Sequence, residues 1–105
     1  MIQGDVCLYS FKAPDKRRPV LVLTQNNLIS VLNAITIAPI TTTILDRQTY
    51  VFLDETDGMR EECAINLASI QTVPKNKIGS MITHLSPARM WEVREAIKFT
   101  FGFDE

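Results

Sequence analysis

Two segments consist almost entirely of apolar residues with high strand propensity, and they constrain the fold more than any other feature. Residues 19–24 read PVLVLT and residues 34–40 read AITIAPI. Asn26 and Asn27 end the first run. Apolar runs of this length are typical of strands that are buried on both faces. The sequence therefore predicts two core strands, with Pro39 restricting the second to a sheet edge or a bulge near its end.

Shorter strands are predicted on both sides of this pair. Four further segments show either alternation of apolar and polar residues or a composition that favours strands: residues 4–11, 50–53, 63–66 and 70–73. We expect a loop at Pro14 and the charged cluster 15–18, and a helical turn or a loop at 27–33. The dipeptide Asp57-Gly58 predicts a turn before the 63–66 strand.

The C-terminal segment changes to a helical period. Ser86 can cap a helix, Pro87 suits its first position, and Gly102 suits its end. Apolar residues recur between them at spacings of three and four, which predicts a core-facing stripe of Met90, Val93, Ile97 and Phe101. Several strands followed by one helix predict an α+β fold, a small β-barrel with a helix packed on it, and we expect a single domain over residues 1–105.

Composition and cysteine content narrow the class of protein. Of the 105 residues, 46% are hydrophobic and 22% charged, the balance of a soluble globular domain. No apolar run approaches the roughly 18 residues that span a bilayer, and no secretory leader is recognisable, so we expect a cytoplasmic protein. Cys7 and Cys63 lie among apolar neighbours, and we interpret them as reduced core cysteines.

The usual catalytic and cofactor motifs are not recognisable in this sequence. The glycines are too scattered for a nucleotide-binding loop. His84 is the only histidine, so a His–His acid/base pair is impossible, and we interpret it as structural. One histidine and two cysteines make a poor metal-ligand set. We therefore expect neither a metal nor a cofactor.

Charge is unevenly distributed along the chain although the net charge is only −1. Residues 1–30 carry four cations, Lys12, Lys16, Arg17 and Arg18, against two aspartates. Residues 54–62 carry five carboxylates against Arg60 alone. A protein with one basic face can attract a polyanion to it, but solvated surface charge explains this pattern equally well.

Two polar segments lie beside the two core strands. Lys16, Arg17 and Arg18 precede the first, and the hydroxyls of Thr41–Thr43 follow the second. If these strands pair antiparallel, Arg18 and Thr41 meet at one rim of the sheet, where a guanidinium fork matches phosphate oxygens. The same residues are also expected without any functional site, from a solvent-exposed basic loop and a threonine run that favours a strand.

Four segments together resemble a known family: GDVCLYSF, RRPVLVLTQN, ITIAPIT and DGMREECAINLASIQTV. In this order and spacing the chain is similar to the MazF/PemK toxin endoribonucleases. The resemblance implies a small SH3-like β-barrel of the CcdB/MazF type with a C-terminal α-helix. It also implies a homodimer that cleaves single-stranded RNA, often mRNA, inhibits translation and growth, and is held inactive by a cognate antitoxin protein.

The resemblance also assigns residues. The family's catalytic arginine falls on Arg18 and its catalytic threonine on Thr41, and the expected products carry 2′,3′-cyclic phosphate and 5′-hydroxyl ends. Arg18 can stabilise the charge that develops on the phosphorane, and Thr41 can hydrogen-bond the scissile phosphate. Neither is a suitable general base, which stays unassigned. RNA contacts are expected from the surrounding polar residues, Lys16, Arg17, Gln25, Asn26, Thr42, Thr43 and Arg47.

The segment after the threonines departs from the family pattern. Leu45, Gln48 and Tyr50 replace the expected arginine, proline and glutamate. Arg47 can restore the lost charge from a neighbouring position, and Tyr50 can stack on an unpaired base. Two alternatives to a nuclease therefore stay open: a toxin of the same fold that binds DNA gyrase, and a catalytically weakened relative that still binds RNA.

Overall fold

Seven antiparallel strands, three short 3₁₀ helices, one short α-helix and one long α-helix make up the part of the chain that the structure describes, residues 1–12 and 17–103. The coordinates are a computed structural model. The elements in chain order are β1 (Asp5–Ser10), β2 (Arg17–Val22), α1 (Asn26–Ile29), β3 (Ala34–Thr41), β4 (Tyr50–Leu53), η1 (Glu55–Asp57), β5 (Cys63–Asn66), η2 (Leu67–Ser69), β6 (Gln71–Pro74), η3 (Lys75–Lys77), β7 (Met81–His84) and α2 (Pro87–Phe101).

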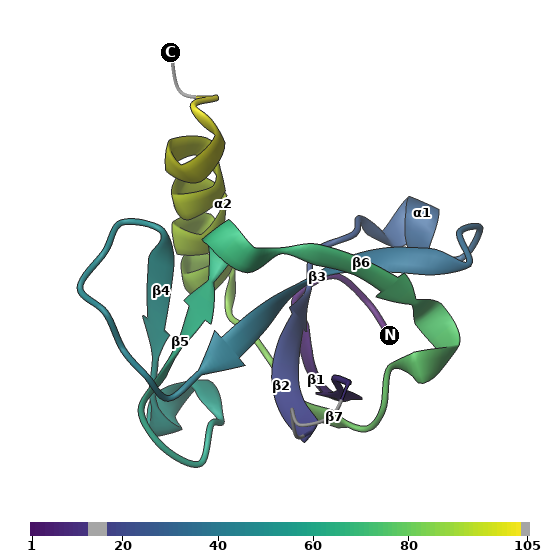
Figure 1. Ribbon diagram of the computed structural model, residues 1–105, viewed down its shortest axis with the longest axis horizontal. Helices are drawn as coiled ribbons and strands as arrows, with labels where there is room; N and C mark the ends of the chain where they lie inside the picture. The colour runs from purple at the N-terminus through teal and green to yellow at the C-terminus, as the bar shows by residue number, and fades with distance from the viewer. Residues whose placement is uncertain (13–16, 104–105) are drawn as a thin grey trace.

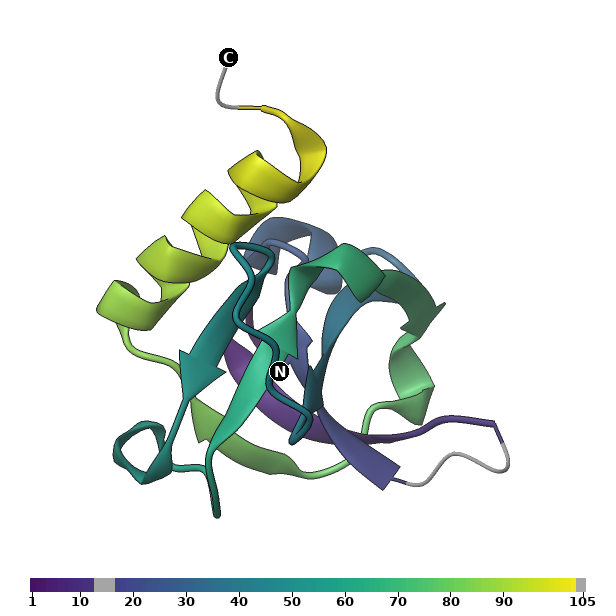
Figure 2. The same cartoon turned by 60° about the vertical axis from the view of Figure 1, so that its left-hand side comes forward.

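The strands form a curled sheet in the order β4-β5-β3-β2-β1-β7, and β6 pairs with β3 from the side (Figure 1). Figure 2 shows the curl, with α2 packed diagonally across one side of it. The result is a half-barrel with a C-terminal helix. The predicted α+β class and barrel-like architecture are confirmed, although the barrel is not closed, because β4 and β7 are the edge strands of the sheet.

Strand β3 lies in the middle of the sheet, so of the two positions predicted for Pro39, a sheet edge or a bulge near the end of the strand, the sheet edge is wrong. One side of β3 pairs with β2, and Pro39 lies opposite Val20. The other side pairs with β6 up to Ile37 and with β5 from Ile40 onward. Pro39 therefore occupies the gap where β3 changes neighbours, and a residue without an N–H donor is tolerated there.

Two further expectations about the strands were wrong. Arg17 and Arg18 belong to β2 rather than to the preceding loop, because they pair with Ser10 and Tyr9 of β1. Residues 81–84 form β7, which was not predicted. Their side chains are half-buried or exposed, so they show no buried run, and only the pairing with β1 makes them a strand.

The sheet and the helix enclose two groups of buried side chains. Leu21, Ile65 and Leu67 belong to the larger group, which packs against Val93 and Ala96 of α2. The smaller group fills the curl and is made of Cys7, Val20, Val22, Ile29, Ile35, Ile37 and Val73. Burial of these apolar side chains is the main contribution to stability.

Helix α2 has the predicted ends. The Ser86 side chain accepts a hydrogen bond from the Arg89 amide at 3.2 Å, and Gly102 ends the helix with φ of 73°. The predicted stripe holds for Val93, which is buried, and for Met90 and Ile97, which are half-buried against the core, but Phe101 is 43% exposed. Over residues 1–12 and 17–103, no helix is both long and apolar enough to cross a bilayer.

Candidate active site

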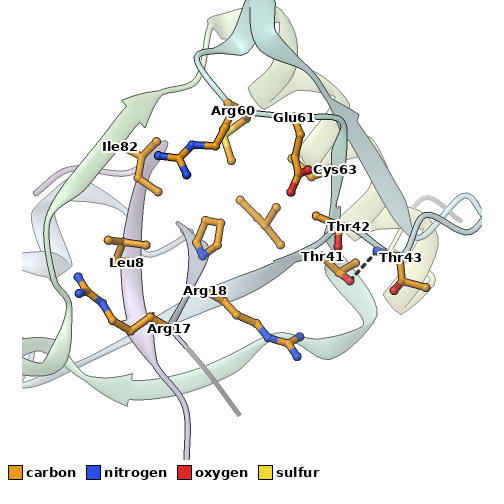
Figure 3. A pocket seen from close by; sticks show the side chains of 13 residues that line it. Leu8, Arg17, Arg18, Thr41, Thr42, Thr43, Arg60, Glu61, Cys63 and Ile82 are labelled. Atoms are coloured by element: carbon orange, nitrogen blue, oxygen red, sulfur yellow. Dashed lines mark hydrogen bonds between the residues drawn. The ribbon is translucent and has the colours of Figure 1, made fainter.

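A pocket of about 820 Å³ opens where β2 begins and β3 ends (Figure 3). Its volume lies in the range typical of ligand sites. Its floor and sides are mainly apolar, with three arginines, one glutamate and three threonines at the rim. The lining residues are Leu8, Arg17, Arg18, Pro19, Ile40, Thr41, Thr42, Thr43, Met59, Arg60, Glu61, Cys63 and Ile82.

The antiparallel register between β2 and β3 brings Arg18 and Thr41 to the same pocket. The register pairs Val20 with Pro39, so the residue two positions before Val20 and the residue two positions after Pro39 lie at one end of the sheet. Both residues line the pocket, as the sequence predicted. In Figure 3 the Arg18 side chain extends toward Thr41 and Thr43.

Arg17 and Arg18 diverge, as neighbouring residues on a strand do. Figure 3 shows the Arg17 side chain directed past Leu8, away from the threonines, and the Arg18 side chain on their side. Both side chains are exposed. The pocket therefore presents two guanidinium groups to two different parts of any ligand that fills it.

The Thr41 hydroxyl is held by the backbone that follows it. Its Oγ1 accepts a hydrogen bond from the Thr43 amide at 3.1 Å (Figure 3). A hydroxyl that accepts from an N–H keeps its own proton available for donation. The Thr41 O–H is thus oriented by the turn and can donate to a phosphate oxygen in the pocket.

Arg60 and Glu61 form the opposite wall of the pocket, and the sequence analysis missed both as site residues. They belong to the segment between η1 and β5, which the sequence analysis treated as an acidic stretch and as part of the family resemblance, without assigning it site residues. In Figure 3 their side chains diverge, with Arg60 directed toward Ile82 and Glu61 directed into the pocket beside Thr42. No local motif marks these residues, because only the pairing of β5 with β3 places them beside Thr41.

A set of polar contacts holds this wall in place. Asp57 Oδ1 accepts from Arg89 Nε of α2 at 2.9 Å, and Asp57 Oδ2 accepts from the Asp54 amide at 2.9 Å. The Thr83 hydroxyl of β7 donates to the Asp57 carbonyl at 2.9 Å. Gly58 follows with φ of 91°, and a Cβ on it would collide with Thr83. Helix α2 and strand β7 therefore both anchor the start of the wall.

The two cysteines are free and buried, as predicted. Burial raises the pKa of the Cys63 thiol, and the carboxylates of Glu61, Asp57 and Asp54 raise it further. Burial, and next the Asp5 carboxylate, also raise the pKa of Cys7. Cys63 lines the pocket as a neutral, poorly nucleophilic thiol rather than as a reactive thiolate.

Three of the other residues expected to contact RNA, Gln25, Asn26 and Arg47, lie outside the pocket. Gln25 and Asn26 follow β2 at its far end, where the Asn26 side chain accepts from the Gln3 amide at 2.7 Å. Arg47 lies in the connection between β3 and β4 and does not line the pocket. Lys16 falls outside the described residues. Thr42 and Thr43 do line the pocket, beside Thr41.

His84 has a structural environment, in agreement with the prediction. Its Nδ1 lies 2.9 Å from Oδ1 of the buried Asp5, whose other oxygen accepts from the Ile2 amide. This pair joins β7 to β1. Among the described residues, no group of three or more His, Cys, Asp or Glu side chains could hold a metal ion.

A curled half-barrel with a terminal helix defines a small α+β protein, and its pocket is lined by guanidinium and hydroxyl groups, which are typical donors to phosphate oxygens. Residues 2–101 match the model of one protein family, and the chain belongs to it: the PemK-like, MazF-like toxins of type II toxin–antitoxin systems. The sequence resemblance to this family is thereby confirmed.

Individual relatives agree with this membership. The chain is 34% identical to endoribonuclease MazF3 of Mycobacterium tuberculosis over 90 residues, covering 86% of this chain and 87% of the relative. The solved structure of toxin MazF-mt6 from the same organism superposes with a TM-score of 0.88 at 31% identity, over 96% of this chain and 99% of that one. A mycobacterial endoribonuclease solved with its cognate antitoxin has the same TM-score at 20% identity, covering 100% and 98%, and shows the shared fold.

Proposed function

We propose that this protein is the toxin of a type II toxin–antitoxin system and that it acts as an endoribonuclease on single-stranded RNA, mRNA included. The observation that carries the proposal is the presence of Arg18 and Thr41 in one pocket, with the Thr41 hydroxyl oriented by the Thr43 amide. Family membership and the MazF3 relative, an endoribonuclease, support the same activity. Cleavage of mRNA would stop translation and growth.

The proposed reaction is an internal transesterification. The ribose 2′-oxygen loses its proton and attacks the adjacent phosphorus, the bond from phosphorus to the 5′-oxygen breaks, and that oxygen is protonated as it leaves. The products are a 2′,3′-cyclic phosphate and a 5′-hydroxyl. Arg18 stabilises the charge on the phosphorane, and Thr41 donates a hydrogen bond to a non-bridging oxygen.

The composition of the pocket supports cleavage without a metal ion. Of the described residues that line the pocket, three carry guanidinium groups, Arg17, Arg18 and Arg60, and one carries a carboxylate, Glu61. A Mg²⁺ ion bound for phosphoryl chemistry requires oxygen ligands of negative charge, which such a cationic site disfavours. The guanidinium groups instead supply the charge stabilisation that a metal would otherwise provide.

Partners and location follow from the same proposal. A toxin of this class needs a cognate antitoxin that keeps it inactive, and its mRNA substrate is in the cytoplasm. The edge strand β7 exposes Met81 and Ile82, which favours pairing of two copies over an isolated chain. We therefore include a homodimer in the proposal.

The alternatives differ in what they require of the pocket. A gyrase-binding toxin has no use for a phosphate-activating arginine beside an oriented hydroxyl, whereas a weakened relative would bind RNA without cutting it. Incubation of the purified protein with a long single-stranded RNA in EDTA, followed by mapping of the cut ends, distinguishes the nuclease from both alternatives, neither of which cuts RNA. We expect cuts with 5′-hydroxyl ends that persist in EDTA and spare duplex RNA. Cutting that stops with EDTA and returns with Mg²⁺ would contradict the proposed chemistry.

A further inference from the structure

Among the residues that the structure describes, Glu61 is the one acidic side chain that lines the pocket, and the proposed cleavage reaction assigns it no role. It is exposed to solvent and directed into the pocket (Figure 3). A carboxylate in this position repels the phosphate groups that the three arginines attract. It therefore has to face a part of the RNA that carries hydrogen-bond donors instead of negative charge.

Glu61 lies across the pocket from Arg18. Arg18 comes from β2 at one side, whereas Glu61 precedes β5 and extends into the pocket from the other side, next to Thr42 (Figure 3). A nucleotide whose phosphate is held by Arg18 and Thr41 can lay its base over Pro19 and Ile40 of the apolar floor. The edge of a base placed there would face the side of the pocket from which Glu61 extends.

We propose that Glu61 is a specificity-determining residue that reads the Watson–Crick edge of a base in the pocket, with guanine preferred. The inference rests on the proposed function. An ionised carboxylate only accepts hydrogen bonds. Guanine offers it two adjacent donors, N1–H and the N2 amino group, which match its two oxygens. Adenine and cytosine offer one amino group, whereas uracil places N3–H between two carbonyls that the carboxylate repels.

The first test maps cut sites in a long RNA of varied sequence for the wild-type protein, Glu61→Gln and Glu61→Ala. We expect one position near the cut with a guanine excess over uracil of about tenfold to a hundredfold, the discrimination typical of a bidentate base contact. Glu61→Gln should accept uracil there, because an amide both donates and accepts. Glu62→Gln is the matched control, since Glu62 lies outside this pocket, and it should keep the wild-type pattern.

Two cleavage outcomes would overturn the inference. One is an unchanged base preference at every position in both Glu61 variants. The other is a uniform loss of rate at all sites in Glu61→Gln, together with loss of the acidic limb of the pH–rate profile. That second result would make Glu61 the general base for the 2′-hydroxyl instead of a reader of the base.

A binding experiment keeps this inference separate from the proposed nuclease function. Short 2′-O-methyl oligonucleotides cannot be cut, and replacing guanine by inosine removes only the N2 amino donor. We expect fluorescence anisotropy to show weaker binding of the inosine oligonucleotide to the wild-type protein and no difference for Glu61→Ala. Equal binding of both oligonucleotides by the wild type would refute the role of Glu61, whatever the cleavage assay shows. Absence of cleavage with a retained guanine preference would refute only the nuclease proposal.

Discussion

Arg18 and Thr41 lie 23 positions apart in the sequence but line the same pocket, because β2 and β3 pair antiparallel with Val20 opposite Pro39. The pairing places a guanidinium and an oriented hydroxyl at one end of two core strands. A rigid sheet is a suitable support for groups that must stay aligned with a reacting phosphate. The proposed chemistry depends on this register more than on any other feature of the fold.

Replacement of Arg18 by alanine should lower the cleavage rate at saturating RNA by a factor on the order of 100 to 1000, the usual cost of removing one charge-stabilising donor. Arg17→Ala is the matched comparison, since Arg17 is the neighbouring arginine and points elsewhere in the pocket. It should mainly weaken binding, by an amount that shrinks as salt rises. Single-turnover kinetics at several salt concentrations measure both. Arg18→Ala that cuts as fast as the wild type would refute the assignment.

Replacement of Thr41 by alanine should reduce the rate to a similar extent while leaving RNA affinity close to that of the wild type. The physical reason is that the hydroxyl acts on one phosphate oxygen and adds little to binding of the rest of the strand. Thr41→Ser keeps a hydroxyl that can accept from the Thr43 amide, so it should recover most of the rate. Equal defects in the alanine and serine variants would show that the methyl group, rather than the hydroxyl, matters.

Arg89→Ala should destabilise the fold and the pocket wall together. Arg89 pairs with Asp57, whose side chain is only 8% exposed, so the substitution leaves a nearly buried carboxylate without this donor. We expect the free energy of unfolding to fall by about 1–3 kcal/mol, measured by urea denaturation. Arg94→Ala, on the exposed side of the same helix, should change it by less than about 0.5 kcal/mol. Equal effects of the two variants would contradict the anchoring role of Asp57 and Arg89.

The free energy of unfolding should fall as the pH rises above about 8.5. Burial raises the pKa of both Cys7 and Cys63 in the folded protein, so the unfolded chain loses these protons first and is favoured at high pH. The loss is at most about 1.4 kcal/mol per thiol for each pH unit. Denaturation curves at pH 7.5 and 9.5 should therefore differ less for the Cys7→Ala, Cys63→Ala double variant than for the wild type. An identical pH dependence would show that the thiols are not the cause.

The protein should be a dimer at micromolar concentration. Strand β7 is an edge strand, and its Met81 side chain is 60% exposed, so pairing with a second copy would cover both apolar surface and free backbone groups. Sedimentation equilibrium measures the mass directly. Met81→Lys should shift the equilibrium toward monomer if this edge is in the interface. A stable monomer of 11.9 kDa in the wild type would refute the expectation.

Local pattern was sufficient for most of the elements and for the prediction that Arg18 and Thr41 lie close together. Runs of β-branched residues predicted β2 and β3 within two residues at each end, because a strand buried on both faces needs apolar side chains at every position. The cap, proline and glycine around α2 act within a few residues of one another, so Ser86 and Gly102 marked its ends correctly. The pattern predicted that Arg18 and Thr41 meet at one rim, because each adjoins a core strand, and the resemblance to the family assigned them a catalytic role.

The remaining strand and the remaining pocket residues could not be predicted, because they depend on contacts between segments that are distant in the sequence. Residues 81–84 become β7 only by pairing with β1, and their own burial carries no strand signal. Arg60 and Glu61 enter the pocket because β5 pairs with β3 and because α2 and β7 hold Asp57, three interactions that no local pattern encodes. Gln25 is close to Arg18 in sequence yet lies at the other end of β2. A strand separates its two ends in space, whereas sheet pairing joins residues that the chain separates, and that pairing decided which side chains form the pocket.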